Sequence, residues 1–177
     1  MKSVYNFVVE PKGQRYNNKK KIGDSELILN TEIFNHQYVN REAVVISTPI
    51  IGNTNIIPGD TVIVHHNVFR RWHNVKGIEK NSKAYFDENT YLINNDQIFL
   101  FKRKNKWIAP KGYCFVKPLK AVDKFNIKSE RPLQGIVKYS DGTVNIGDLI
   151  GFRPNSEYEF IVDGERLYRV LSNFITI

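Results

Sequence analysis

Apolar residues along the chain occur in short runs, and no long window repeats them at the helical spacing of three and four residues. Most of them are Val, Ile, Tyr and Phe, which favour strands. Gly, Pro, Asn and Asp separate the runs, as turns require. The pattern therefore predicts an all-β chain with strands at 4–10, 42–48, 59–66, 90–95, 97–101, 113–118, 134–140, 147–152, 158–162, 166–171 and 173–177.

Four blocks of this pattern occur twice, in the same order. The blocks at 5–11, 41–47, 56–67 and 86–101 match those at 113–118, 133–139, 144–155 and 162–177. Chance explains one or two such matches between β-rich segments, whereas four in register indicate a duplicated unit. We therefore predict two domains, residues 1–104 and 105–177. They differ most in the loop after the first strand, which is much longer in the first half, and in segment 68–84, which has a five-residue counterpart.

Both halves contain a Gly-Asp pair before an apolar strand and close on a further apolar strand. The residues concerned are Gly59, Asp60, Val62 and Val64 with 95–101, and Gly147, Asp148, Ile150 and Phe152 with 171–177. A Gly-Asp pair alone marks any tight turn, but this order and spacing in both halves resemble the GroES-type co-chaperonin family. The resemblance covers nearly all of both halves. It implies two tandem small irregular β-barrels of GroES-like type.

The resemblance also implies a function in protein folding. A protein of this kind forms a homo-oligomeric ring, caps a GroEL-type chaperonin and closes the chamber that holds an unfolded client protein. Terminal strands at 95–101 and 173–177 that pair with a neighbour's first strand would supply the ring contact, because exposed strand edges demand partners. ATP hydrolysis belongs to the chaperonin, so we expect no enzymatic activity and no cofactor in the chain itself.

Three consecutive aliphatic residues, Leu27, Ile28 and Leu29, lie in the polar loop that follows the first predicted strand. The loop spans about residues 12–40, and its composition offers the triplet no partner strand on either side. The resemblance implies that this loop is mobile and that the triplet docks into a hydrophobic groove of the chaperonin. We therefore take the triplet as the chaperonin-binding site.

An alternative interpretation of the triplet stays open at this point. Residues 26–30 also fit an ordinary short strand at the edge of the barrel, packed with Ile33, Phe34 and Tyr38. The corresponding loop of the second half, residues 119–131, is short and its apolar residues are dispersed. We expect the first half alone to contact the chaperonin.

The formal net charge of +8 raises the possibility of a nucleic-acid partner. The basic residues form separate short runs at 17–21, 69–73 and 101–107, with acidic residues between them, which makes this partner unlikely. The alternative function is nevertheless a small-β-barrel protein that binds nucleic acid, or a ring-forming phage structural protein. Residues 69–72 fit three roles: stacking with nucleic acid, lining the inner surface of the lid, or packing segment 68–84 onto the second half.

Catalytic and metal-binding patterns are not found in the sequence. Adjacent histidines on a strand point to opposite faces, so His65 and His66 are not expected to share a metal ion. The single cysteine, Cys114, is expected to be a buried small hydrophobic residue. Asp60 and Asp148 are expected to be turn residues.

The location expected from the sequence is cytoplasmic. No apolar run approaches the roughly 20 residues that cross a bilayer, and the first residues lack the apolar region of a signal peptide. Segments 48–55 and 140–145 are too short to build the hairpin that roofs the cage in the family. T-even-type phage co-chaperonins also lack that roof, which favours a phage-encoded protein in the host cytoplasm.

Overall fold

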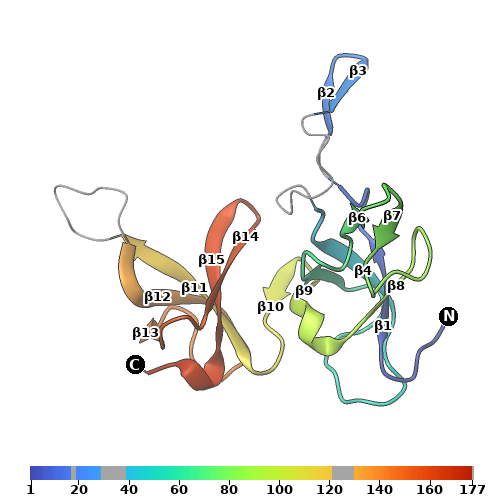
Figure 1. Ribbon diagram of the computed structural model, residues 1–177. Helices are drawn as coiled ribbons and strands as arrows, with labels where there is room; N and C mark the ends of the chain where they lie inside the picture. Colours follow the sequence, from blue (N-terminus) through green and yellow to red (C-terminus); the bar gives the residue numbers. More distant parts are fainter. Residues whose placement is uncertain (17–18, 29–38, 121–129, 177) are drawn as a thin grey trace. The chain divides into compact units, whose positions relative to one another are not determined.

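The computed structural model describes residues 1–16, 19–28, 39–120 and 130–176 (Figure 1). Their regular structure consists of β-strands and short 3₁₀ helices, and the described residues include no α-helix. The prediction of an all-β chain is therefore confirmed. The chain divides into two compact units, Met1–Arg103 and Lys104–Ile177. Each unit is described by itself below.

Unit one is built on one antiparallel sheet. Its strands are β1 (Phe7–Pro11), β4 (Glu42–Ser47), β5 (Thr61–Val64), β8 (Tyr91–Ile93) and β9 (Ile98–Arg103). Within unit one the sheet has the order β9-β5-β4-β1-β8, and β10 (Lys106–Ile108) follows β9 along the chain. Consecutive residues of β5 and β9 are buried, from Val62 to Val64 and from Ile98 to Phe101. Strands buried on both faces read as continuous apolar runs, which explains why these segments were recognised in the sequence.

Unit two is built on a second antiparallel sheet. Its strands are β11 (Tyr113–Lys120), β12 (Glu130–Ser140), β13 (Leu149–Gly151), β14 (Glu157–Val162) and β15 (Glu165–Leu171), in the order β13-β12-β11-β15-β14. Its core includes Cys114, Val116, Val137, Ile150, Phe152 and Val170. Gly135 lies where the first two strands of the unit come close, since a Cβ there would be 2.9 Å from the carbonyl oxygen of Lys117.

The two units share one order of paired strands. The order β5-β4-β1-β8 in unit one corresponds to β13-β12-β11-β15 in unit two. In both, the first strand of the unit passes a bulge in its neighbour: the register skips Ile46 in β4 and Lys138 in β12. The strand predicted at 173–177 is wrong at its start, because Ser172–Phe174 forms a 3₁₀ helix. Ile175 still bridges Phe152, at the place where β9 pairs with β5 in unit one.

The Gly-Asp turn of unit one is held by three backbone hydrogen bonds. Val45 N donates to Asp60 O at 3.0 Å, Gly59 N donates to Val45 O at 2.7 Å, and Asp60 N donates to Ile57 O at 3.2 Å. Gly59 has a φ of +91°, a conformation that favours glycine. The Asp60 carboxylate accepts a hydrogen bond from Ile57 N at 3.0 Å. Asp60 is therefore a turn residue, as the sequence predicts.

The same bonds recur in unit two. Val137 N donates to Asp148 O at 2.9 Å, Gly147 N donates to Val137 O at 2.8 Å, and Asp148 N donates to Asn145 O at 3.2 Å. Gly147 has a φ of +95°, and the Asp148 carboxylate accepts from Asn145 N at 3.1 Å. Two turns that match in backbone geometry, in the same strand order, are what duplication of one unit produces.

The aspartates of the two turns differ in their surroundings. Asp60 is 4% exposed, and its two carboxylate oxygens accept hydrogen bonds from Arg103 Nε at 3.0 Å and Nη2 at 2.6 Å. Arg103 Nη2 also donates to the carbonyl oxygen of Asn55 at 2.6 Å. Asp148 is exposed. The repeated backbone turn thus carries a buried ion pair in unit one.

Strand pairing among the described residues closes neither main sheet. Within unit one the outermost strands are β9 and β8, and in unit two they are β13 and β14. The closed barrels expected from the family resemblance are therefore not confirmed.

Candidate functional site

Two residues of the aliphatic triplet, Leu27 and Ile28, lie on a β-hairpin within the long loop of unit one. The hairpin consists of β2 (Lys19–Ile22) and β3 (Ser25–Ile28), which pair with each other in a two-stranded sheet of their own. Lys20 is opposite Leu27 and Lys19 is opposite Ile28. Leu27 and Ile28 thus end β3, while Leu29 lies outside the described residues. Residues 17–18 and 29–38 also lie outside them, so the expected mobility of the loop stays a prediction.

The expectation that the flanks offer no partner strand is wrong. Lys19–Ile22, in the basic flank, pairs with β3. Gly23 and Asp24 form the two-residue connection, and Gly23 has a φ of +61°. Glycine with positive φ at the first position of such a connection is typical of a tight hairpin turn. The signal was therefore present in the sequence, and the three lysines obscured it because lysine is uncommon in strands.

The alternative interpretation of residues 26–30 agrees with the backbone only in part. Ser25–Ile28 is a strand, as that interpretation holds. The strand pairs with β2 instead of with an edge of the main sheet. Ile33, Phe34 and Tyr38, which that interpretation packs against the triplet, lie outside the described residues.

The two ends of the long loop are bonded to each other. Lys12 N donates to Glu42 O at 2.9 Å, and Asn40 N donates to Arg15 O at 2.9 Å. One step further into the loop, Tyr16 and Val39 form an isolated antiparallel bridge. The chain therefore leaves and re-enters the body of unit one through a paired stem.

Asn40 joins the two sides of this stem through its side chain. It is 5% exposed, and its Nδ2 donates to Lys12 O at 3.0 Å and to Gln14 O at 2.9 Å. Its Oδ1 accepts a hydrogen bond from Glu42 N at 2.9 Å. A buried amide with three partners has its hydrogen-bonding capacity largely satisfied. Removal of the Asn40 side chain would leave all three partners without these hydrogen bonds. Asn40 cannot be recognised from the sequence alone, because one asparagine in a polar loop carries no distinctive pattern.

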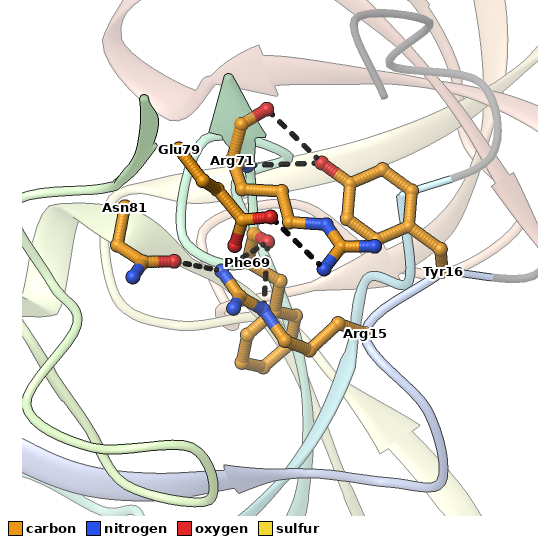
Figure 2. A network of polar contacts seen from close by, with 6 residues as sticks. All are labelled: Arg15, Tyr16, Phe69, Arg71, Glu79 and Asn81. Atoms are coloured by element: carbon orange, nitrogen blue, oxygen red, sulfur yellow. Dashed lines mark hydrogen bonds and ion pairs between the residues drawn. The ribbon is translucent and has the colours of Figure 1, made fainter. Parts of the chain in front are cut away.

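A second hairpin packs against the stem. It consists of β6 (Arg71–His73) and β7 (Glu79–Asn81), within segment 68–84. Arg71 N donates to the Tyr16 hydroxyl oxygen at 2.9 Å, and the Arg71 guanidinium lies 5.2 Å from the centre of the Tyr16 ring (Figure 2). Arg71 also forms an ion pair with Glu79 at 3.5 Å. Segment 68–84 thus supports the root of the long loop.

Arg15 ties the stem to the same hairpin from the other side. Its Nη2 donates to Phe69 O at 3.1 Å and to Asn81 Oδ1 at 2.8 Å (Figure 2). Its guanidinium lies 5.4 Å and 5.5 Å from the ring centres of Tyr85 and Tyr91. Burial raises the pKa of Tyr91 to about 12, so this phenol stays neutral. Arg15 therefore holds the first residues of the loop against the rings of Tyr85 and Tyr91.

Of the residues 69–72, Phe69 belongs to the core of unit one. Its side chain is fully buried, and its ring meets that of Tyr91 edge to face at 4.7 Å. This residue is therefore not available to pack segment 68–84 onto the second unit. Trp72, by contrast, is 36% exposed.

We expect Asn40→Ala to loosen the stem. Two carbonyl groups and one N–H group lose their partner, which should lower the free energy of unfolding of unit one by about 2 kcal/mol. Hydrogen exchange measured by mass spectrometry should become faster in residues 12–16 and 39–42. Asn6→Ala is the control, since Asn6 bonds Asn94 through an exposed contact at 2.7 Å. Unchanged exchange in the Asn40 variant would contradict the role of this side chain.

The histidines do not lie as the sequence predicts. His65 and His66 follow the end of β5, and their rings stack with centres 4.2 Å apart. The rule of alternating faces does not apply, because neither residue belongs to a strand. Across the described part of the chain, no group of three or more His, Cys, Asp or Glu side chains could hold a metal ion.

Cys114 is buried, as predicted. Burial raises the pKa of its thiol to about 12. A thiol of this kind is not ionised at neutral pH, so it is no nucleophile there.

Residues 121–129 of the second unit's loop, with Phe125 and Ile127, lie outside the described residues.

Comparisons with known proteins add no relative. The chain matches no family model, no curated protein and no solved structure. In the part of the chain that the structure describes, no helix has the length and apolar character to span a membrane. The hairpin that ends on Leu27 and Ile28, which lies between the two bonded ends of the loop along the chain, is the candidate site that the chain's own residues support.

Proposed function

We propose that this protein is a tandem-repeat co-chaperonin that caps a GroEL-type chaperonin ring through Leu27, Ile28 and Leu29. The observation that supports the proposal is the hairpin of β2 and β3, which forms a sheet separate from the main sheet of unit one. A segment that pairs only with itself can enter another protein's groove without breaking the sheet of its own unit. In this proposal each unit is a small irregular barrel of GroES-like type.

The stem gives the hairpin a fixed root. The bonds of Asn40 and Arg15 hold the loop ends together before any partner binds. The entropy of closing the loop is then lost on folding and not on docking. A loop whose ends are already joined leaves fewer residues for the partner to order, which lowers the cost of association.

A single loop should nevertheless bind weakly. Burial of an aliphatic side chain contributes roughly 1.5 to 3 kcal/mol, so three contribute about 5 to 9 kcal/mol before costs. The loss of translational freedom and of loop entropy cancels most of this gain. Several loops on one homo-oligomeric ring bind together through their high effective concentration. A ring of this chain would thus hold firmly to the chaperonin and still release it.

The chaperonin supplies the chemistry in this proposal. The co-chaperonin closes the chamber around an unfolded client protein, and ATP hydrolysis takes place in the chaperonin. The lysine-rich and asparagine-rich composition agrees with a phage-encoded version that acts in the cytoplasm of its host.

Capture by an immobilised GroEL-type chaperonin tests the proposal. We expect retention of the protein in the presence of adenine nucleotide, with little loss when the salt is raised from about 50 to about 200 mM. Aliphatic docking tolerates salt, whereas binding of nucleic acid weakens steeply over this range. Failure to bind the chaperonin with or without nucleotide would overturn the proposal.

A further inference from the structure

A pocket of about 520 Å³ opens beside the hairpin of β6 and β7 in unit one. Its volume lies in the range of small-molecule sites. It is lined by Asn67, Arg70, Trp72, Ser82, Lys83 and Gln97 among others. One aromatic ring, two cations and two amides therefore surround one space, and none of the lining residues carries a carboxylate.

The two faces of the β6–β7 hairpin have different roles. Successive residues of a strand point to opposite faces. Arg71 points to Tyr16 and the stem, so Trp72 points the other way, toward the pocket that it lines. Lys80 is opposite Trp72 in the register and shares its face. One face thus anchors the hairpin, and the other presents an indole ring among positive charges.

The cations of the pocket favour an anionic ligand. The Nε atom of Arg70 is buried and has no hydrogen-bond partner among the residues that the structure describes. A buried donor without an acceptor costs free energy, which an oxygen atom of a bound ligand would recover. Lys83 adds a second positive charge to the lining. Phosphate oxygens match both groups.

The remaining side chains favour an aromatic ligand with polar edges. Indole rings stack on nucleobases, and this stacking tolerates any base. Gln97 Oε1 accepts a hydrogen bond from Asn94 N at 3.0 Å, so the side chain is held while its amide nitrogen remains a donor. Ser82 Oγ donates to Val68 O at 2.6 Å, which fixes the wall on the other side.

We propose that this pocket binds a nucleotide, with the base stacked on Trp72 and the phosphate held by Arg70 and Lys83. The same unit of base and phosphate occurs in a free nucleotide and in single-stranded nucleic acid. The site lies on the β6–β7 hairpin and uses none of the triplet residues, so it does not depend on capping of a chaperonin. A double change of Leu27 and Leu29 to Asp should leave nucleotide binding unaltered.

Tryptophan fluorescence tests the proposal directly. The chain has two tryptophans, so in a Trp107→Phe variant the emission reports Trp72 alone. The titrants are ATP, an oligothymidylate of about eight nucleotides, and inorganic triphosphate. Saturable quenching by ATP alone identifies a free nucleotide, and quenching by the oligonucleotide identifies a single strand; both support the proposal. Quenching by none of the three titrants would overturn the proposal. Triphosphate that binds as tightly as ATP would also overturn it, because charge alone would then account for binding.

Matched variants assign the binding to the pocket. Binding of a fluorescein-labelled oligonucleotide or nucleotide is followed by anisotropy. Trp72→Leu should weaken it about tenfold or more, and Lys83→Gln should weaken it about fivefold. Lys76→Gln removes the same charge from the exposed turn of the hairpin. It should change binding less than about twofold, because a single solvent-exposed charge contributes little. Equal losses for Lys83→Gln and Lys76→Gln would show diffuse attraction and contradict a pocket.

Discussion

Replacement of both Leu27 and Leu29 by Asp is expected to abolish capture by the chaperonin. Each change removes an aliphatic contact and places a carboxylate in an apolar groove, where burial of an unpaired charge is costly. The loss of about 3 to 6 kcal/mol of gross burial from two side chains is enough to remove a weak single-loop contact. The melting temperature should stay nearly unchanged, because among the described strands β3 pairs with β2 and not with the main sheet.

Ile22→Asp is the matched control for this experiment. Ile22 is an exposed aliphatic residue of the same hairpin, 56% exposed, on the strand opposite the triplet. This variant should keep most of the binding. If the double variant unfolds, the triplet belongs to the folded core of unit one, and its role as a docking segment is wrong. If the double variant folds and still binds, the contact with the chaperonin lies elsewhere in the chain.

Asp60→Ala is expected to lower the free energy of unfolding of unit one by about 3 kcal/mol. The carboxylate is 4% exposed and accepts hydrogen bonds from Ile57 N and from two nitrogens of Arg103. Loss of one partner of a buried ion pair leaves the other charge uncompensated. Arg103 is 32% exposed, so water compensates it in part, which keeps the loss at the lower end of the range. The melting temperature should fall by roughly 10 to 20 °C.

Asp148→Ala supplies the control, because the turn in unit two has the same backbone hydrogen bonds. The Asp148 carboxylate is exposed and accepts from Asn145 N at 3.1 Å. We expect a loss of about 1 kcal/mol, as for one turn hydrogen bond. Urea unfolding can be followed separately in each unit by pulsed hydrogen exchange, read by mass spectrometry in peptides from β4 and β5 for unit one and from β12 and β15 for unit two. Equal losses for the two aspartates would contradict the stabilising role of the Arg103 pair.

The main sheets were predictable because their strands carry apolar runs between turn residues. Ten of the eleven predicted segments overlap strands of the structure, and the exception, 173–177, begins in a 3₁₀ helix. Residues 173–177 are apolar enough to suggest a strand, but the 3₁₀ helix Ser172–Phe174 turns the chain before Ile175 bridges Phe152. The order of strands in each sheet depends on contacts between distant segments, which periodicity cannot reveal.

The hairpins around the candidate sites were missed because their strands are short and polar. β2 contains three lysines, and β6 and β7 are three residues each, with exposed or half-exposed side chains. The turn of the second hairpin has its own signal, since Asn74 Oδ1 accepts from Lys76 N at 2.9 Å and from Ile78 N at 3.0 Å. The turn before β10 lacks a sequence signal of this kind. Lys104 and Asn105 both have positive φ there, a conformation for which hairpin turns usually contain glycine.

The location of the stem bonds, at the two ends of the long loop, has an evolutionary consequence. In the described part of the chain, the hydrogen bonds that close the stem lie at or before Tyr16 and at or after Val39. Doubling the length of a flexible segment between such fixed ends costs only about 0.6 kcal/mol. The whole sequence between Tyr16 and Val39 can therefore be replaced without disturbing the sheet of unit one. A lineage with this scaffold can therefore change what the loop binds by replacing a single peptide.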